Sequence, residues 1–213
     1  MSILASVAEM IGVVAAATSG TLLGLRKNFD MFGVIFLAII TTIGGGIIRD
    51  VFLGHLPPRA FENPAFVAVA TAVALFVAVF YKVIKNPIIE GMAQGILYFD
   101  AIGLGSFCAI GFYYAICDGA NSGFLVVTVA VFTGIGGGML RDILANRIPF
   151  VLKRDIYAMA AVIGALAAYL LHPYVGADAA LYICMCITTL IRVLALKFDI
   201  QLPPFMIDIN RGR

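Results

Sequence analysis

The heptapeptide GGGxxRD occurs twice in this chain: residues 44–50 read GGGIIRD, and residues 136–142 read GGGMLRD. Both copies lie in strongly apolar stretches. Three consecutive glycines weaken a helix, because glycine gains more backbone freedom than any other residue when the helix opens. In lipid, a break is tolerated only where protein or water surrounds the freed backbone groups. The two copies therefore predict two broken membrane helices, and a permeation or substrate site rather than an anchor.

The composition is that of an integral membrane protein. Of the 213 residues, 62% are hydrophobic and 12% are charged, and the mean hydropathy is +1.06. About 20 apolar residues span a bilayer as a helix. Seven spans are predicted, at residues 3–25, 31–53, 65–84, 92–117, 124–145, 156–171 and 177–196. Because little sequence is left for a catalytic domain, we expect an all-α polytopic membrane protein that is not an enzyme.

Basic residues are distributed unevenly between the loops. With seven spans, every Lys and Arg except Arg49 and Arg59 falls on the side of the carboxyl terminus. The positive-inside rule then predicts an amino terminus outside the cell, or in an organelle lumen, and a cytoplasmic carboxyl terminus. One span more or fewer would destroy this segregation, so the charges also support the count of seven.

The similarity between the two halves extends beyond the heptapeptide. Residues 41–50 (TTIGGGIIRD) align with residues 133–142 (TGIGGGMLRD), and Gly54 then aligns with Asn146. Gly and Asn are the residues that best end a helix in the left-handed conformation. Upstream, Glu9 aligns with Asp100, and Gly20 with Gly111. The same helix end is therefore predicted twice.

Each repeated unit contains three spans, and an odd number of crossings requires the second unit to be inverted in the membrane. We therefore predict a 3+3 inverted repeat plus a seventh helix, with the second and fifth spans broken at Gly-Gly-Gly. The predicted units are residues 1–90, residues 91–174, and residues 175–213, the last comprising the seventh helix and a cytoplasmic tail.

A candidate ion pathway follows from the predicted breaks. The first halves of the two broken helices would enter from opposite faces and end in unpaired carbonyl oxygens near the membrane interior. Carbonyl oxygens can replace the hydration shell of a monovalent cation, the only metal expected, at residues 44–46 and 136–138. The alternative is that the glycines let two helices pack closely. The candidate residues are Thr41, Thr42, Gly44, Gly45, Gly46, Thr133, Gly136, Gly137 and Gly138.

The motif charges Arg49, Asp50, Arg141 and Asp142 lie inside apolar spans, where charges are costly and face protein or water. Adjacent residues on a helix point about 100° apart, so we expect their partners on neighbouring helices or at freed carbonyls rather than within one motif. Two roles stay open. The charges form a gate or filter, or the arginine ties down the helix structurally.

Three further charges lie within spans. Glu9 and Asp100, near the starts of the first and fourth spans, would attract cations at the two pore mouths; the alternative is that they cap helix amino termini. Arg192, near the end of the seventh span, is expected to extend to the membrane interface.

The doubled motif, the seven spans and the three-plus-three repeat resemble the prokaryotic trimeric intracellular cation (TRIC) channel family, some bacterial members of which are labelled glycine transporters. The Asp100-x-x-Gly103 sequence of the second unit also fits. The resemblance implies a homotrimer with one pore per subunit, passing K⁺, and Na⁺ as a second permeant ion, in a prokaryotic inner membrane. It implies no cofactor, and no partner other than further copies and membrane lipids: neither nucleic acid nor a soluble protein.

Animal members of that family carry a lysine-containing motif in the corresponding helix, and this chain has no lysine there. Regulation by voltage, calcium or lipid therefore does not carry over from the resemblance. An inverted repeat with broken helices is equally typical of a secondary transporter, so transport of a small solute such as glycine is the alternative function. A non-conducting scaffold is a third hypothesis, which the doubled Arg-Asp pairs disfavour.

Overall fold

The computed structural model describes residues 2–83, 88–153 and 156–200, and every regular element within these ranges is a helix. Seven helices are long and apolar enough to cross a membrane, so the predicted all-α fold with seven spans is confirmed. Two short helices, α3 and α7, lie in the connections. The bounds are α1 Ile3–Arg26, α2 Met31–Phe52, α3 Arg59–Glu62, α4 Ala65–Val83, α5 Ile88–Cys117, α6 Gly123–Leu144, α7 Phe150–Lys153, α8 Ala158–Val175 and α9 Ala177–Lys197.

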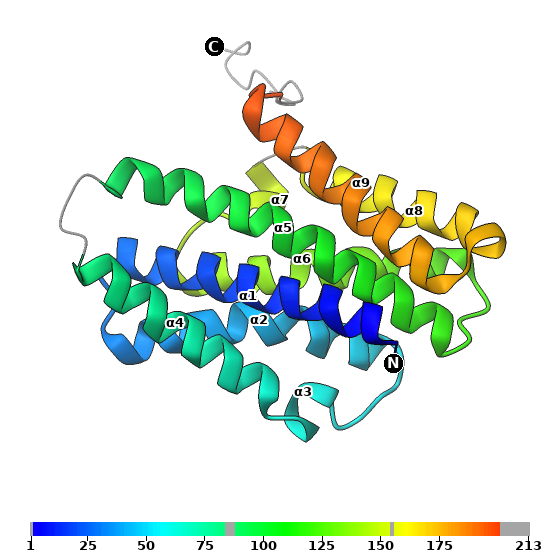
Figure 1. Cartoon of the computed structure of the whole chain (residues 1–213), viewed down its shortest axis with the longest axis horizontal. Coiled ribbons are helices and arrows are strands. Elements are labelled where there is room, and N and C mark those ends of the chain that lie inside the picture. Colours follow the sequence, from blue (N-terminus) through cyan, green and yellow to red (C-terminus); the bar gives the residue numbers. More distant parts are fainter. Residues whose placement is uncertain (1, 84–87, 154–155, 201–213) are drawn as a thin grey trace, which may run out of the picture.

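Helices α1, α2, α5 and α6 form the centre of the molecule. Helix α1 packs against α5, and α2 packs against α6; α4 covers α1 and α2, whereas α8 and α9 cover α5 and α6. Figure 1 shows α4 on one flank and the pair α8 and α9 on the other. Helices α1 and α5 run in opposite directions, as do α2 and α6. The GGGxxRD segments of α2 and α6 therefore lie at the centre.

The prediction that the glycines break two helices is wrong. Helix α2 continues from Met31 to Phe52 and α6 from Gly123 to Leu144, so both run through their glycine triplets. In lipid no water competes for the backbone groups, which favours keeping the hydrogen bonds of a helix. The premise of carbonyl oxygens freed at residues 44–46 and 136–138 is therefore removed.

The glycines instead allow α2 and α6 to cross in close contact. A Cβ atom on Gly45 would overlap the carbonyl oxygen of Thr133, and one on Gly137 would overlap the carbonyl oxygen of Thr41. A Cβ atom on Gly136 would lie 3.2 Å from the Cα atom of Gly45. Small residues let membrane helices approach backbone to backbone, and this alternative explains the first two glycines of each triplet.

The connections repeat between the two halves as closely as the crossing does. Helix α2 is followed by Gly54 and α6 by Asn146, with φ angles of 76° and 51°, which confirms the left-handed helix ends expected there. Similar contacts recur where each half's first helix packs on its second: a Cβ atom on Gly20 would meet the Thr41 side chain, and one on Gly111 would meet that of Thr133.

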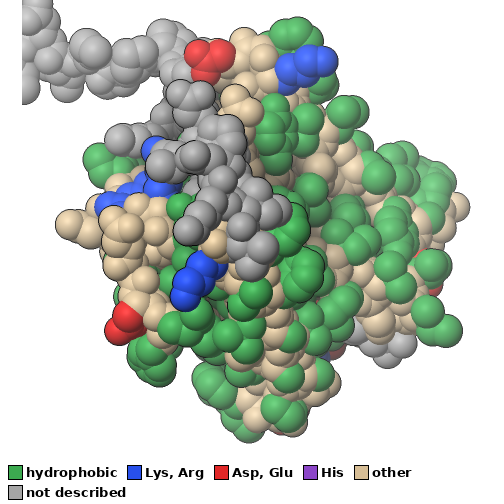
Figure 2. Space-filling model, turned by 60° about the vertical axis from the view of Figure 1, so that its left-hand side comes forward, with side chains coloured by type: hydrophobic (Ala, Val, Ile, Leu, Met, Phe, Trp, Pro, Cys, Tyr) green, Lys and Arg blue, Asp and Glu red, His purple; other side chains and the backbone are tan. Residues whose placement is uncertain are grey.

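Five of the described basic side chains, those at helix ends outside the buried clusters, gather at one end of the molecule. Helices α1, α4, α6 and α9 all end there, in the left and upper part of Figure 1, and their last turns or following loops supply the basic residues. Figure 2 looks toward this end and shows separate Lys and Arg side chains on a mainly hydrophobic surface. The basic residues are Arg26, Lys27, Lys82, Arg147 and Lys197. A hydrophobic surface between polar ends suits a protein that spans a bilayer.

Candidate functional site: two buried arginine clusters

The arginine of the second motif lies at the centre of a fully buried polar cluster. The Nη1 atom of Arg141 donates to Asp100 Oδ1 on α5 and to Ser19 Oγ on α1, both at 2.6 Å. The Nε atom of Arg141 donates to Asp142 Oδ1 at 3.0 Å. Arg141 has no exposed surface. A buried charge of this kind is stable only when it is paired and hydrogen-bonded, so the cluster joins α1, α5 and α6. We call Ser19, Asp100, Arg141 and Asp142 the Arg141 cluster.

Tyr157 and Arg192 extend this cluster toward the last two helices. The guanidinium of Arg192 lies 5.0 Å from the centre of the Tyr157 ring, and both side chains are buried. The expectation that Arg192 extends to the membrane interface is therefore wrong. Burial, and next the negative charge of Asp100, raise the pKa of Tyr157 well above its usual value, so its hydroxyl stays protonated.

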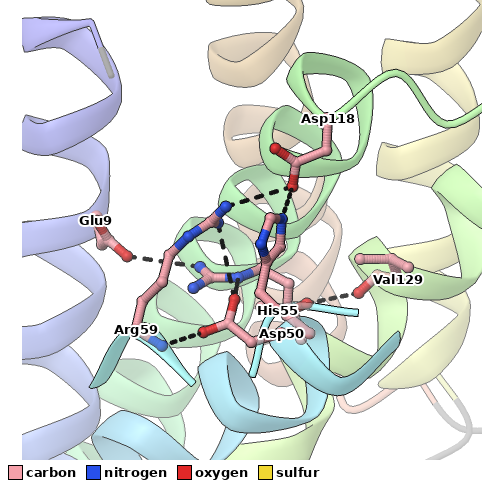
Figure 3. Close-up of polar contacts among 8 residues, drawn as sticks. Glu9, Asp50, His55, Arg59, Asp118 and Val129 are labelled. Carbon is pink, nitrogen blue, oxygen red and sulfur yellow. Dashed lines mark hydrogen bonds and ion pairs between the residues drawn. The ribbon is translucent and has the colours of Figure 1, made fainter. Parts of the chain in front are cut away.

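The arginine of the first motif forms a related but more open cluster. The Nε atom of Arg49 donates to Asp50 Oδ1 at 2.9 Å, and its Nη1 atom lies 3.6 Å from Glu9 Oε1 on α1. Figure 3 shows Arg59 placed between Asp50 and Asp118, with Glu9 facing them from α1. The Arg59 Nη2 atom lies 3.5 Å from Asp118 Oδ2. We call Glu9, Arg49, Asp50, Arg59 and Asp118 the Arg49 cluster.

The ring of Tyr114 contacts both cations of the Arg49 cluster. The guanidinium carbons of Arg49 and Arg59 lie 4.0 and 4.3 Å from the centre of the Tyr114 ring. The ring face is attractive to each cation, which lets two guanidinium groups share a small volume. Tyr114, Arg59 and Asp118 were not among the predicted site residues, because nothing in the sequence brings the end of α5 to the loop after α2.

Each motif aspartate also holds the loop that follows its helix. Asp50 Oδ2 accepts a hydrogen bond from the backbone N–H of Arg59 at 2.8 Å, and Asp142 Oδ2 accepts one from that of Phe150 at 3.2 Å. Arg59 and Phe150 are the first residues of α3 and α7. Both short helices were missed in the sequence, although a proline precedes each of them, which is a known signal for a helix start.

Two expectations about the charges are corrected by these contacts. A direct pair within one motif was expected to be poor, yet it forms in both motifs, because the long arginine side chain folds back to reach the neighbouring carboxylate. Glu9 and Asp100 do not cap helix starts, the alternative role considered for them, because both are buried and face the arginines. Their role at the pore mouths stays a prediction. Helix α5 begins at Ile88, about three turns before Asp100, and Ser2 is the residue that caps α1.

Two small cavities lie beside the clusters. A cavity of about 40 Å³ adjoins the Arg49 cluster and is lined by Glu9, Thr42, Gly46, Arg49 and Phe107, among others. A second, of about 10 Å³, adjoins the Arg141 cluster and is lined by Thr41, Asp100, Gly138, Tyr157 and again Phe107. A water molecule needs roughly 10–15 Å³, so the second has room for about one. The Phe107 side chain on α5 is therefore part of the wall of both.

Most of the predicted glycine and threonine site residues lie at the helix crossing or beside one of the two cavities. Gly44, Gly45, Gly136 and Gly137 form the helix crossing. Thr42 and Gly46 line the larger cavity, whereas Thr41 and Gly138 line the smaller one. The hydroxyls of Thr41, Thr42 and Thr133 donate to carbonyl oxygens four residues earlier in their own helices.

The fold and its two buried arginine clusters define an integral membrane protein with charges held inside the bilayer region. The "Glycine transporter" family model matches the chain twice, at residues 6–82 and 97–173. Among curated proteins, the UPF0126 inner membrane protein YadS of Escherichia coli K12 is 35% identical over 207 residues, 95% of this chain and 96% of its own. The UPF0126 membrane protein YvgT of Bacillus subtilis is 35% identical over 195 residues, 92% of this chain and 93% of its own.

Solved structures give the same relationship. A prokaryotic TRIC channel in 0.5 M KCl is 34% identical, with a TM-score of 0.87, and covers 95% of this chain and 100% of its own. The TRIC orthologue from Rhodobacter sphaeroides is 30% identical, with a TM-score of 0.85, and covers 93% and 100%. A TRIC channel from C. elegans, 16% identical with a TM-score of 0.57, shares the fold. This chain belongs to the family that the glycine transporter model describes, which includes the prokaryotic TRIC channels.

Proposed function

We propose that this protein is a passive channel for monovalent cations, with K⁺ as the chief permeant ion and one pore in each subunit of a homotrimer. The observation that carries the proposal is the pair of polar cavities that share Phe107, because they form an interrupted polar path beside the helix crossing. The similar solved structures are described as TRIC cation channels, which are channels rather than enzymes.

The proposed path runs from the Arg49 cluster, past Phe107, to the Arg141 cluster. Side-chain oxygens of Glu9, Thr42, Thr41 and Asp100 line it, in place of the glycine carbonyls expected from the sequence. Carboxylate and hydroxyl oxygens suit a cation that gives up part of its hydration shell. We infer that the path is closed in this structure, since each cavity is small and Phe107 forms part of the wall of both.

We assign different roles to the two motif charge pairs. The completely buried Arg141 and Asp142 hold three helices together and act structurally. Arg49 lines the larger cavity, where its positive charge faces the path and pairs with the negative charge of Glu9. A gate at this position would act by moving the Arg49 side chain relative to Glu9.

We further propose the membrane arrangement expected from the sequence: two inverted three-helix units, an amino terminus outside, and a cytoplasmic carboxyl terminus in a prokaryotic inner membrane. The opposite directions of α1 and α5 and the double match of one family model support the inverted units. The gathering of basic side chains at one end supports the orientation, and the inner membrane name of the E. coli relative supports the location.

A secondary transporter of a small zwitterion such as glycine is the second candidate. One observation favours it: the larger cavity offers a carboxylate (Glu9) and two guanidinium groups (Arg49 and Arg59) to the same small volume. Such a cavity could bind an ammonium group and a carboxylate together. The description of the matching family model agrees with this reading.

Single-channel recording of the purified protein in planar bilayers under a K⁺ gradient tests the proposal. Discrete unitary currents that reverse near the K⁺ equilibrium potential are expected for a channel. Parallel liposome assays measure saturable uptake of labelled glycine. Glycine uptake without unitary currents would reject the channel and support the transporter.

Replacing Phe107 with leucine is expected to raise K⁺ flux severalfold, because it removes part of the wall between the cavities while keeping an apolar side chain. Phe112 is the matched control: it is also buried on the same helix but lines neither cavity. The measurement is thallium or rubidium flux into liposomes for Phe107→Leu and Phe112→Leu. Equal flux in the two variants would remove Phe107 from the path.

A further inference from the structure

The basic end of the molecule contains a surface pocket that the proposed ion path does not use. It has a volume of about 270 Å³ and is lined by Leu23, Arg26 and Lys27 at the end of α1 and by Arg147 after α6. Three cationic side chains, from the end of α1 and the loop after α6, therefore line one pocket together with the buried Leu23.

The related position in the other half of the chain carries an imidazole beside a carboxylate. Lys27 precedes Asn28, and Asp118 precedes Gly119; Asn28 and Gly119 have φ angles of 57° and 76° and follow the ends of α1 and α5. His55 and Arg147 also correspond, because their backbone N–H groups donate to Asp50 O and Asp142 O respectively, each at 2.8 Å.

The two positions differ in whether they contain an acidic side chain. Where the loop after α2 meets the end of α5 (the α2–α5 position), the Nε2 atom of His55 lies 2.9 Å from Asp118 Oδ2. Where the loop after α6 meets the end of α1 (the α6–α1 position), Lys27 takes the place of the aspartate and lines the same pocket as the like charge of Arg147. Among the residues that the structure describes, no carboxylate forms an ion pair with Arg26, Lys27 or Arg147.

The nearby acids are already engaged. Asp30, in the same loop as Lys27, accepts the N–H of Gly33 at 2.7 Å and caps α2, and Asp142 belongs to the Arg141 cluster. Partial burial lowers the pKa of Arg147, and the positive charge of Arg26 acts in the same direction, whereas the charge of Asp142 opposes them. Convergent cations without an internal anion would be stabilised by an anion from outside.

We propose that the pocket formed by Leu23, Arg26, Lys27 and Arg147 binds a phosphate group. A guanidinium matches phosphate oxygens with paired N–H donors, and lysine adds a compact charge. The phosphate comes from an anionic lipid headgroup or from a free phosphate in solution. The pocket lies at the end of two membrane-crossing helices, which is where basic pockets meet headgroups. The site takes an anion and is separate from the proposed cation path.

The substitution Lys27→Asp tests the proposal. It places a carboxylate at the α6–α1 position, as Asp118 does at the α2–α5 position, so the protein itself supplies the anion. Native mass spectrometry of the purified protein with phosphatidylglycerol or phosphatidylcholine measures lipid binding, and a titration with inorganic phosphate measures the free anion by its effect on the apparent Tm. A second variant, Arg147→Gln, removes a cation without adding a charge. Lys82→Asp, at the exposed end of α4, makes the same charge change on the same end of the molecule but outside the pocket.

Arg147→Gln is expected to weaken phosphatidylglycerol binding about fivefold, because one cation near a lipid surface contributes roughly 1 kcal/mol. Lys27→Asp is expected to weaken it more strongly. Lys82→Asp should bind like the wild type. Selective loss of phosphatidylglycerol binding identifies a headgroup, whereas selective loss of the inorganic phosphate effect identifies a free phosphate. If Lys27→Asp and Arg147→Gln bind both as the wild type does, or if Lys82→Asp loses as much, the proposal is wrong. Neither readout depends on ion conduction.

Discussion

Gly45→Ala is expected to lower the apparent Tm of the detergent-purified protein by on the order of 10 °C. The new methyl group would overlap the backbone carbonyl of Thr133, and a backbone atom in a helix cannot turn aside as a side chain end can. Overpacking of this kind costs about 3 kcal/mol, and about 2–4 °C of Tm is lost per kcal/mol in a chain of this size. Gly137→Ala should behave alike, since it meets Thr41 in the reciprocal contact.

Gly46→Ala is the matched control in the same triplet. A Cβ atom there would have its nearest neighbour, the Arg49 Nη2 atom, at 3.8 Å, and alanine is the better helix former. Its Tm should equal or slightly exceed that of the wild type. Intrinsic tyrosine fluorescence or light scattering during heating measures the transition. A Gly45→Ala protein as stable as Gly46→Ala would contradict the close helix crossing.

Arg141→Gln is expected to have the largest effect of any single substitution on stability, about 3–5 kcal/mol. It would leave the carboxylates of Asp100 and Asp142 buried without their cation. The double variant Arg141→Gln, Asp100→Asn should recover part of this loss, because it also removes one of the uncompensated charges. Yield of folded protein and the apparent Tm are the measurements.

Arg59→Gln provides the comparison for that experiment. The Arg59 side chain is 27% exposed, and its closest carboxylate oxygen lies at 3.5 Å, so water can replace part of its interactions. Its loss should lower the Tm far less than that of Arg141. If both variants were equally stable, the Arg141 cluster would not be what joins α1, α5 and α6.

The spans could be predicted from the sequence because lipid imposes a simple rule, about 20 apolar residues for each crossing. The helix ends at Gly54 and Asn146 were predicted correctly for a similar reason, since the left-handed conformation favours few residues. Both predictions depend on local chemistry.

What failed was the interpretation of the glycine triplets. A triplet can mark a break or a close contact, and the difference depends on whether another backbone lies opposite, which in this chain is supplied by a helix about ninety residues away. The partners of Arg141 were missed in the same way: Ser19 and Asp100 come from two other helices. Sequence periodicity does not contain such distances, although a charge repeated inside two apolar spans did indicate that partners must exist.

The reciprocal crossing of α2 and α6 also bears on how the chain is made. Synthesis proceeds from the amino terminus, so α1, α2 and α4 enter the membrane while Gly45 still has no carbonyl of Thr133 against it. Helix α1 likewise lacks α5, its main neighbour, at that stage. The first three helices therefore form an unfinished surface that only the later half can cover. A nascent chain paused at this point would offer its glycine face to any other membrane helix nearby, and prompt completion of the second half is what protects it.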